Sequence, residues 1–199
     1  MMLTQQQGKD IVKYARAVIV GQFKGVKAKV PMSLLPLVEE KRGVFVTLHR
    51  GHDLRGCIGF PEPSHRLLVA VEHSALSAAF EDPRFLPIHE DEMYSICLEV
   101  SVLTKPEIVE VKEPKEYVKR IRIGRDGLIA ERGLNRGLLL PQVPLEQRWS
   151  VDDYLMHTCA KAGLMPDEWT KKGFRLYCFQ AQIFSEDEPM GEVVERKIR

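Results

Sequence analysis

A short glycine-rich segment holds the residue types in this chain that are best suited to chemistry. Residues 54–59 read Leu-Arg-Gly-Cys-Ile-Gly. The thiolate form of cysteine is the nucleophile, and a nearby guanidinium such as that of Arg55 favours the thiolate at Cys57. Glycine inside a strand often marks a position at which another group comes close to the backbone. The segment therefore predicts a site with Cys57 as nucleophile and with three ligand-binding residues, Arg55, Gly56 and Gly59.

Two further side chains complete the predicted site. His49 lies in the strand before this segment, and a hairpin pairing of the two strands turns His49 and Cys57 to the same face. A cysteine with a histidine within reach is the minimum arrangement for an activated nucleophile. Glu99, on the polar face of a later strand, is placed to orient His49 or Arg55. The predicted catalytic residues are therefore Cys57, His49 and Glu99.

The same residues allow a structural interpretation. Cysteine is a small residue that packs well in an apolar core, so Cys57 can simply fill space under a helix. Gly59 can admit a bulky neighbour such as Phe45. Arg55 and Glu99 can form an ion pair whose only role is in the fold. Packed thiols outnumber reactive ones, so the residues alone favour the structural interpretation.

The sequence predicts no metal site, and it leaves the question of a cofactor open. The chain has four widely spaced cysteines and no Cys-x-x-Cys pair. His49, His52 and Cys57 offer nitrogen and sulfur ligands, but nothing signals a fourth ligand. The glycine-containing residues 124–127 lack both phosphate-loop patterns, so we interpret them as a tight turn.

Two strands at residues 44–50 and 54–60, joined by a turn at 51–53, position the predicted site. If Arg50 pairs with Leu54, apolar side chains share one face of the hairpin: Val44, Val46, Leu48, Leu54, Ile58 and Phe60. The opposite face then holds Phe45, Thr47, His49, Arg55, Cys57 and Gly59. A slip of one residue would mix the two sets, so the pattern favours this register.

The rest of the chain mixes helices and strands. Helical spacing predicts helices at residues 4–23, 64–80, 114–119 and 150–162, with Thr4, Ser64 and Ser150 as N-caps. Strands are predicted at residues 94–104, 121–123, 128–130 and 174–184, and the tail after residue 185 is expected to fray. No element is predicted within residues 26–40. Hairpin-like strand pairs between helices predict an α+β fold with an antiparallel sheet flanked by helices.

The overall composition argues against some classes of protein. The 199 residues include 29 Lys and Arg and 28 Asp and Glu, which gives a net charge of +1. No basic stripe dominates, so nucleic-acid binding is unsupported. No run approaches the roughly 20 apolar residues of a membrane span, and the first ten residues have no apolar stretch of the signal-peptide type. We therefore expect a cytoplasmic protein without membrane association.

Several segments, in order along the chain, resemble the AMMECR family, named after the Alport syndrome, midface hypoplasia and elliptocytosis chromosomal region. They are residues 54–59, 82–85 (Asp-Pro-Arg-Phe), 99–103, 123–128, 137–143 and 159–164, together with Trp169. The resemblance implies one AMMECR-type domain with two lobes and a cleft between them. The larger lobe is expected at residues 1–104 and 173–199 and the smaller lobe at residues 105–172. The resemblance also adds Arg84 to the expected ligand-binding residues.

The resemblance implies no settled activity. Members of the family often occur beside, or fused to, Memo-like and radical-SAM proteins, which makes such a protein an expected partner. Together with the residues above, this favours a cleft around Arg55 and Cys57 that binds a small-molecule ligand or catalyses a thiol-dependent reaction. One alternative is a non-enzymatic accessory module that binds a Memo-like or radical-SAM partner. The other is a purely structural signature with RNA binding elsewhere, so the sequence does not decide whether the protein is an enzyme.

Overall fold

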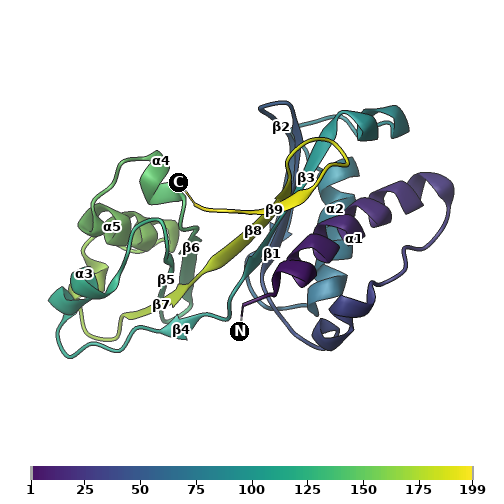
Figure 1. The fold of residues 1–199 in the computed structure, drawn as a ribbon. Coiled ribbons are helices and arrows are strands. Elements are labelled where there is room, and N and C mark those ends of the chain that lie inside the picture. The colour runs from purple at the N-terminus through teal and green to yellow at the C-terminus, as the bar shows by residue number, and fades with distance from the viewer. Residues whose placement is uncertain (1, 199) are drawn as a thin grey trace. The chain divides into compact units, whose positions relative to one another are not determined.

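The computed structural model describes residues 2–198 and is drawn in Figure 1. The chain forms two compact units. The first unit consists of residues 2–103 and 182–197, and the second consists of residues 104–181 with Ile198. Each unit has a β-sheet and a hydrophobic core of its own.

The first unit is built on a five-stranded sheet with the strand order β2-β1-β3-β8-β9. Its strands are β1 (Val44–Arg50), β2 (Asp53–Phe60), β3 (Ile96–Leu103), β8 (Ala181–Glu186) and β9 (Val193–Arg196). Strand β1 pairs antiparallel with both β2 and β3, and β8 pairs antiparallel with β9. The segment that carries Cys57 is therefore an edge strand, beside the strand that carries His49.

Two long helices lie on one side of this sheet (Figure 1). Helix α1 (Gln5–Lys24) begins after Thr4, whose side chain accepts a hydrogen bond from the backbone N–H of Gln7. It ends at Gly25, which has the left-handed φ of 64° that glycine adopts without strain. Helix α2 (Leu67–Phe80) packs against β1 and β2. Two 3-10 helices complete the unit, η1 (Met32–Leu37) and η2 (Glu90–Tyr94).

Alternation along the strands decides which side chains contact these helices. Val44, Val46 and Leu48 of β1 and Leu98 and Val100 of β3 are fully buried in one cluster with residues of α1 and α2. Because successive strand residues point to opposite faces, the residues between them lie on the face directed away from α1 and α2.

The second unit contains a four-stranded antiparallel sheet with the order β4-β7-β5-β6. Its strands are β4 (Glu107–Ile108), β5 (Gly127–Arg132), β6 (Asn135–Leu139) and β7 (Arg175–Phe179). Its helical segments are η3 (Pro114–Glu116), α3 (Tyr117–Arg120), α4 (Val143–Glu146), α5 (Val151–Lys161) and η4 (Glu168–Thr170).

Helix α5 closes the core of the second unit against β5 and β6. It begins with a capping box between Ser150 and Asp153. Its fully buried Tyr154 places a hydroxyl 3.1 Å from the carbonyl oxygens of Asp126 and Leu139. A side chain at Gly137 would begin 2.2 Å from the backbone nitrogen of Ala162, so this glycine lets the end of the helix lie close to the sheet.

The predicted fold class is confirmed, since helices combine with two antiparallel sheets in an α+β arrangement. The predicted helices at residues 4–23 and 150–162 are present as α1 and α5, with the caps at Thr4 and Ser150. The predicted hairpin is present as β1 and β2. Within residues 2–198, no helix is long and apolar enough to cross a bilayer.

Four details of the predicted elements are wrong in the first unit or at its boundary. Ser64 does not cap α2, because its N–H and hydroxyl are both engaged with the carbonyl of Glu62, and the helix begins after Arg66. Residues 32–37, where no element was expected, form η1. The single strand predicted at 174–184 is two strands in different sheets, because Gln180 leaves the ladder and donates its N–H to the hydroxyl of Thr104. The tail expected to fray contains β9.

The strand predicted at residues 121–123 is also wrong. The carboxylate of Asp126 accepts a hydrogen bond of 2.9 Å from the backbone N–H of Arg122, and the backbone N–H of Asp126 donates to the carbonyl of Arg122. These bonds form a turn before β5 instead of a strand. The partner of β5 in the hairpin is β6, which follows it.

Candidate functional site

The predicted catalytic residues lie on one face of the first sheet. We call this the polar face and define it by Phe45, Thr47 and His49 of β1, Cys57 and Gly59 of β2, and Cys97, Glu99 and Ser101 of β3. Register partners lie side by side on the same face of a sheet. Since β1 is paired with β2 and β3, it brings Cys57, His49 and Glu99 to the same face, as the sequence predicted for Cys57 and His49.

Thr47 is at the centre of the polar face. It is the register partner of Cys57 in β2 and of Glu99 in β3. Its hydroxyl donates a hydrogen bond of 3.2 Å to the sulfur of Cys57. His49 lies two residues further along β1 and is the partner of Cys97. The thiol, the hydroxyl and the carboxyl thus form one row, and the imidazole begins the next row beside a second thiol.

Burial shifts the imidazole and the carboxyl of this face towards their neutral forms. It lowers the pKa of His49, and the positive charge of Arg196 lowers it further. It raises the pKa of Glu99, although the attraction of Arg196 opposes this. Neither side chain makes a hydrogen bond or an ion pair within residues 2–198. Titratable groups that are shifted and unpartnered are a common feature of functional sites.

Cys97 is the second thiol of the polar face. Burial raises its pKa above the ordinary range, and the carboxylate of Glu186 acts in the same direction. Because a thiol with a raised pKa stays protonated near pH 7, Cys97 is a weaker nucleophile than an unshifted cysteine. The sequence analysis did not single out this residue, although the alternation of β3 places it on the same face as Glu99.

Arg55 lies in a β-bulge of the edge strand. Leu48 pairs with Gly56 and His49 pairs with Leu54, so Arg55 is an extra residue without a partner in β1. The predicted pairing of Arg50 with Leu54 is therefore wrong at this end of the hairpin, and Leu54 is the partner of His49 instead of a member of the core face. A bulge shifts the register by one residue and redirects side chains.

The guanidinium of Arg55 is held by η2. It makes hydrogen bonds of 3.1 and 3.0 Å to the two carboxylate oxygens of Glu92, and one of 2.9 Å to the carbonyl of Leu86. This ion pair lowers the pKa of Glu92. The carboxylate that pairs with Arg55 is thus Glu92 and not Glu99, which leaves Glu99 free for another role.

Asp82 and Arg84 together clamp the backbone of Cys57. The carboxylate of Asp82 accepts a hydrogen bond of 2.9 Å from the N–H of Cys57, and the guanidinium of Arg84 donates one of 3.0 Å to its carbonyl. Arg84 also binds both carboxylate oxygens of Asp82, at 2.9 and 2.7 Å. Edge strands present unpaired backbone groups, and these two side chains satisfy both groups at the cysteine.

The clamp has a clear electrostatic signature. Hydrogen bonds from the Arg84 side chain hold the pKa of the buried Asp82 carboxyl well below its usual range, and the N–H of Cys57 contributes in the same direction. The sequence analysis expected Arg84 to bind a ligand and did not assign a role to Asp82. The sequence did contain a signal for this clamp, because the Asp-Pro-Arg-Phe segment places a carboxylate and a guanidinium two residues apart.

The two glycines of the segment allow close approach by protein atoms. A side chain at Gly56 would begin 2.1 Å from the carbonyl oxygen of Ala78 in α2. One at Gly59 would begin 2.3 Å from the carbonyl oxygen of Val44 and 2.5 Å from the ring of Phe45. Gly56 therefore lets α2 pack on the edge strand, and Gly59 accommodates Phe45 as the structural interpretation expected.

The histidines near the segment do not gather around one point. His52 is exposed in the turn between β1 and β2, whereas His49 lies on the polar face. Within residues 2–198, no group of three or more His, Cys, Asp and Glu side chains is arranged to hold a metal ion. The side chains of the polar face offer an imidazole, a carboxyl, two hydroxyls and two thiols.

Comparison with known proteins identifies the family. The family model described as AMMECR1 matches residues 12–184. Protein MJ0810 of Methanocaldococcus jannaschii is 54% identical over 199 residues, covering 99% of this chain and 98% of that protein. Protein MK0488 of Methanopyrus kandleri is 50% identical over 202 residues, covering 98% of this chain and 96% of that protein.

A solved structure supports the same assignment. The crystal structure of PH0010 from Pyrococcus horikoshii matches with a TM-score of 0.81 and 42% sequence identity, covering 98% of each chain. None of these three names states an activity, so they establish ancestry and fold but no chemistry. The resemblance noted in the sequence is confirmed, and the chain belongs to the AMMECR1 family.

Proposed function

We propose that the polar face of the first sheet binds a small polar molecule and transfers protons to and from it. His49 is the proton acceptor, because its lowered pKa leaves the imidazole neutral near pH 7. Glu99 is the proton donor when it carries a proton, and its raised pKa increases the protonated fraction at any given pH above that of an ordinary glutamate. The observation that carries the proposal is that Thr47 pairs with both Cys57 and Glu99, so that all three side chains and His49 share one face.

The spacing of the strands suits one small ligand. Neighbouring strands lie roughly 4.7–4.9 Å apart, so the row from Cys57 through Thr47 to Glu99 spans roughly 9.5 Å. His49 is two residues, or roughly 7 Å, along β1 from Thr47. A molecule the size of a small metabolite contacts all four side chains at once. A general acid and a general base need to be within hydrogen-bonding reach of the same substrate.

Cys57 either shapes the polar face or reacts as a nucleophile, and its contact with Thr47 favours the nucleophile. The hydroxyl of Thr47 donates to its sulfur, and a donor to sulfur stabilises the negatively charged form of a nucleophile. The clamp of Asp82 and Arg84 fixes its backbone, which holds the sulfur in one place relative to Thr47. The second candidate function is therefore a thiol-dependent reaction at the same face, with Cys57 attacking an electrophilic ligand.

The proposal is tested by screening a library of small polar metabolites against the full chain by ligand-observed NMR. A ligand of the polar face binds the wild type and binds the double variant His49→Asn/Glu99→Gln at least tenfold more weakly, since two hydrogen bonds of roughly 1 kcal/mol each are lost. The matched control is His52→Asn/Glu90→Gln, which removes the same groups from exposed positions. Equal binding to all three proteins contradicts the proposal.

The two candidate functions separate on one further variant. Cys57→Ser keeps a small polar side chain and the clamp on its backbone. If the face only transfers protons, this variant keeps ligand affinity and turnover within a few-fold of the wild type. If Cys57 is a nucleophile, the Cys57→Ser variant binds the ligand without forming the covalent adduct that the wild type forms. Intact-protein mass spectrometry detects the adduct.

A further inference from the structure

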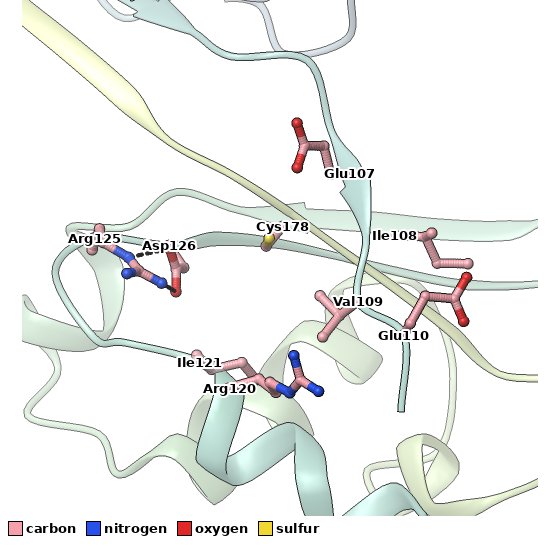
Figure 2. Close-up of a pocket in the computed structure, with 9 residues that line it drawn as sticks. All are labelled: Glu107, Ile108, Val109, Glu110, Arg120, Ile121, Arg125, Asp126 and Cys178. Atoms are coloured by element: carbon pink, nitrogen blue, oxygen red, sulfur yellow. Dashed lines mark hydrogen bonds and ion pairs between the residues drawn. The ribbon is translucent and has the colours of Figure 1, made fainter. Parts of the chain in front are cut away.

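The second unit has a pocket of its own, which is drawn in Figure 2. It lies beside β4 and β7 and has a volume of about 330 Å³. Small-molecule sites occupy roughly 300–1,000 Å³, so this pocket is large enough for a ligand of a few heavy atoms to about a dozen. None of its lining residues belongs to the polar face of the first sheet.

The floor of the pocket is apolar. Val109, Ile121 and Cys178 line it, whereas Figure 2 shows Ile108 and Glu110 pointing to the other side of the strand. Ile121 is buried and Cys178 is partly buried. Burial raises the pKa of Cys178, and the charges of Asp126 and Glu107 raise it further, so the thiol stays neutral. A ligand lying on this floor gains contact with aliphatic groups.

One wall of the pocket is an internally neutralised pair. Arg125 makes two hydrogen bonds of 2.7 Å to the two carboxylate oxygens of Asp126. Asp126 is buried and also accepts the backbone N–H of Arg122. Because both charges are already matched, this pair shapes the wall and does not demand a charged ligand.

Three charged side chains that line the pocket are unpaired within residues 2–198. Glu107, Glu110 and Arg120 are all exposed, and none makes a hydrogen bond or an ion pair with its side chain, but Glu110 points to the other side of the strand. Figure 2 shows the carboxylate of Glu107 and the guanidinium of Arg120 on opposite sides of Val109. The pocket therefore presents a negative group at one end of an apolar floor and a positive group at the other.

We propose that this pocket binds a short zwitterion, with its ammonium group at Glu107 and its carboxylate at Arg120. Glu107 and Val109 are two residues apart in an extended segment, which separates them by roughly 7 Å, and Arg120 lies beyond Val109 as seen from Glu107. The two charges of the ligand therefore need at least this separation. An α-amino acid carries both charges on one carbon and is too short, whereas the termini of a dipeptide are separated by a peptide unit. The guanidinium fork of Arg120 is matched to a carboxylate.

The dipeptide assignment is tested by isothermal titration of the full chain with L-alanyl-L-valine. Four probes isolate the two charges: the dipeptide, its N-acetyl derivative, its C-terminal amide, and L-alanine. We expect saturable binding of the dipeptide and at least tenfold weaker binding of each of the other three probes. The N-acetyl derivative and the amide each lack one charge-assisted contact, and in L-alanine the two charges are too close together.

Substitutions assign each charge to its residue. Glu107→Gln weakens binding of the dipeptide at least tenfold but leaves binding of the N-acetyl derivative unchanged. Arg120→Gln also weakens binding of the dipeptide at least tenfold but leaves binding of the C-terminal amide unchanged. Glu113→Gln and Lys119→Gln are the matched controls, since both residues are exposed and lie outside the pocket, and they leave affinity unchanged. The proposal is overturned if the dipeptide shows no saturable binding at millimolar concentration, if the blocked derivatives bind equally well, or if neither pocket variant changes the affinity.

Discussion

The hydroxyl of Thr47 in β1 donates a hydrogen bond to the sulfur of Cys57 in the neighbouring edge strand β2. Thr47 pairs on its other side with Glu99, so one threonine connects a thiol to a carboxyl whose pKa is raised. The arrangement depends on β1 lying between β2 and β3. It gathers on one face residues that are separated by more than fifty positions in the chain, such as Thr47 and Glu99.

Removing the hydroxyl of Thr47 tests its contact with Cys57. Thr47→Val keeps the shape of the side chain and removes the donor, so the negatively charged form of the sulfur loses one hydrogen bond. We expect iodoacetamide to alkylate Cys57 several-fold more slowly at pH 7, in line with roughly 1 kcal/mol for a hydrogen bond. Site-resolved mass spectrometry provides the rate. Ser101→Ala, on the same face, is the control, and an unchanged rate in Thr47→Val shows that the contact has no influence on reactivity.

Neutralising Asp82 tests the clamp on the edge strand. Asp82→Asn keeps the shape but weakens the contacts with Arg84 and with the N–H of Cys57, so we expect a loss of about 2 kcal/mol in the free energy of unfolding at pH 7. The pKa of Asp82 is lowered in the folded state, so its contribution is fully present above the unfolded value of roughly 3.9 and is lost progressively as the pH falls from there towards the lowered folded value.

Urea unfolding at pH 7 and pH 3 measures both parts of this prediction. The difference between wild type and Asp82→Asn shrinks at the lower pH, whereas Asp91→Asn, at an exposed position of η2, has little effect at either pH. A difference between wild type and Asp82→Asn that is the same at both pH values would show that the carboxylate charge is not what holds the clamp together.

Glu92 and Glu99 are predicted to affect stability in opposite directions. Glu92 is paired with Arg55 and its pKa is lowered, so Glu92→Gln destabilises the fold by about 1 kcal/mol at pH 7. Glu99 has a raised pKa and no ion pair within residues 2–198, so Glu99→Gln removes a desolvated charge and stabilises the fold by up to about 1 kcal/mol. Stability given up at a functional residue is a recurrent cost of activity.

The pH dependence distinguishes the two glutamates. The contribution of Glu92 is present above the unfolded pKa and is lost as the pH falls through its lowered folded value. The advantage of Glu99→Gln is present at pH 7 and disappears as the pH falls through the raised folded value, where wild-type Glu99 is protonated. Chemical unfolding between pH 4 and 8 measures both trends. A Glu99→Gln variant less stable than wild type at pH 7 would indicate that Glu99 has a structural partner.

Two glycines of the first hairpin are predicted to differ in their tolerance of alanine. In Gly56→Ala the new methyl group meets the carbonyl oxygen of Ala78 at 2.1 Å, so α2 must move, at a cost of roughly 1–3 kcal/mol or more. In Gly51→Ala there is open space, and the cost is limited to roughly 1–2 kcal/mol for a left-handed φ of 62°. Thermal unfolding compares them, and a Gly56→Ala protein as stable as wild type contradicts the close packing.

The local patterns of the sequence were sufficient to predict the hairpin and its two faces. The alternation of β1 placed Thr47 and His49 on one side, and the helical spacing predicted α1 and α5 with their caps. The bulge at Arg55 was not predictable in this way, because it is fixed by the contacts of Arg55 with Glu92 and Leu86, which lie more than thirty residues away. The same contacts explain why the expected partner, Glu99, was the wrong carboxylate.

The split of residues 174–184 into two strands has a similar origin. The apolar alternation is continuous, so only a tertiary contact, from the N–H of Gln180 to Thr104, shows where one sheet ends and the other begins. The clamp of Asp82 and Arg84 could not be predicted from local sequence patterns either, because it binds the backbone of Cys57 in a different element. Sequence patterns thus predicted the candidate residues, whereas the contacts between elements decide what each residue binds.

The central claim is that His49 and Glu99 form a proton-transfer site on the polar face, and side-chain NMR titration of both residues tests it most directly. The protein is labelled with ¹³C in histidine and glutamate, and His49→Asn and Glu99→Gln assign the signals. We predict a titration midpoint for His49 below the ordinary value of 6.5 and one for Glu99 above its ordinary value of 4.5. A charged imidazole at pH 7 together with a fully ionised carboxylate near pH 5 would contradict the account, because neither the base nor the acid would then be available.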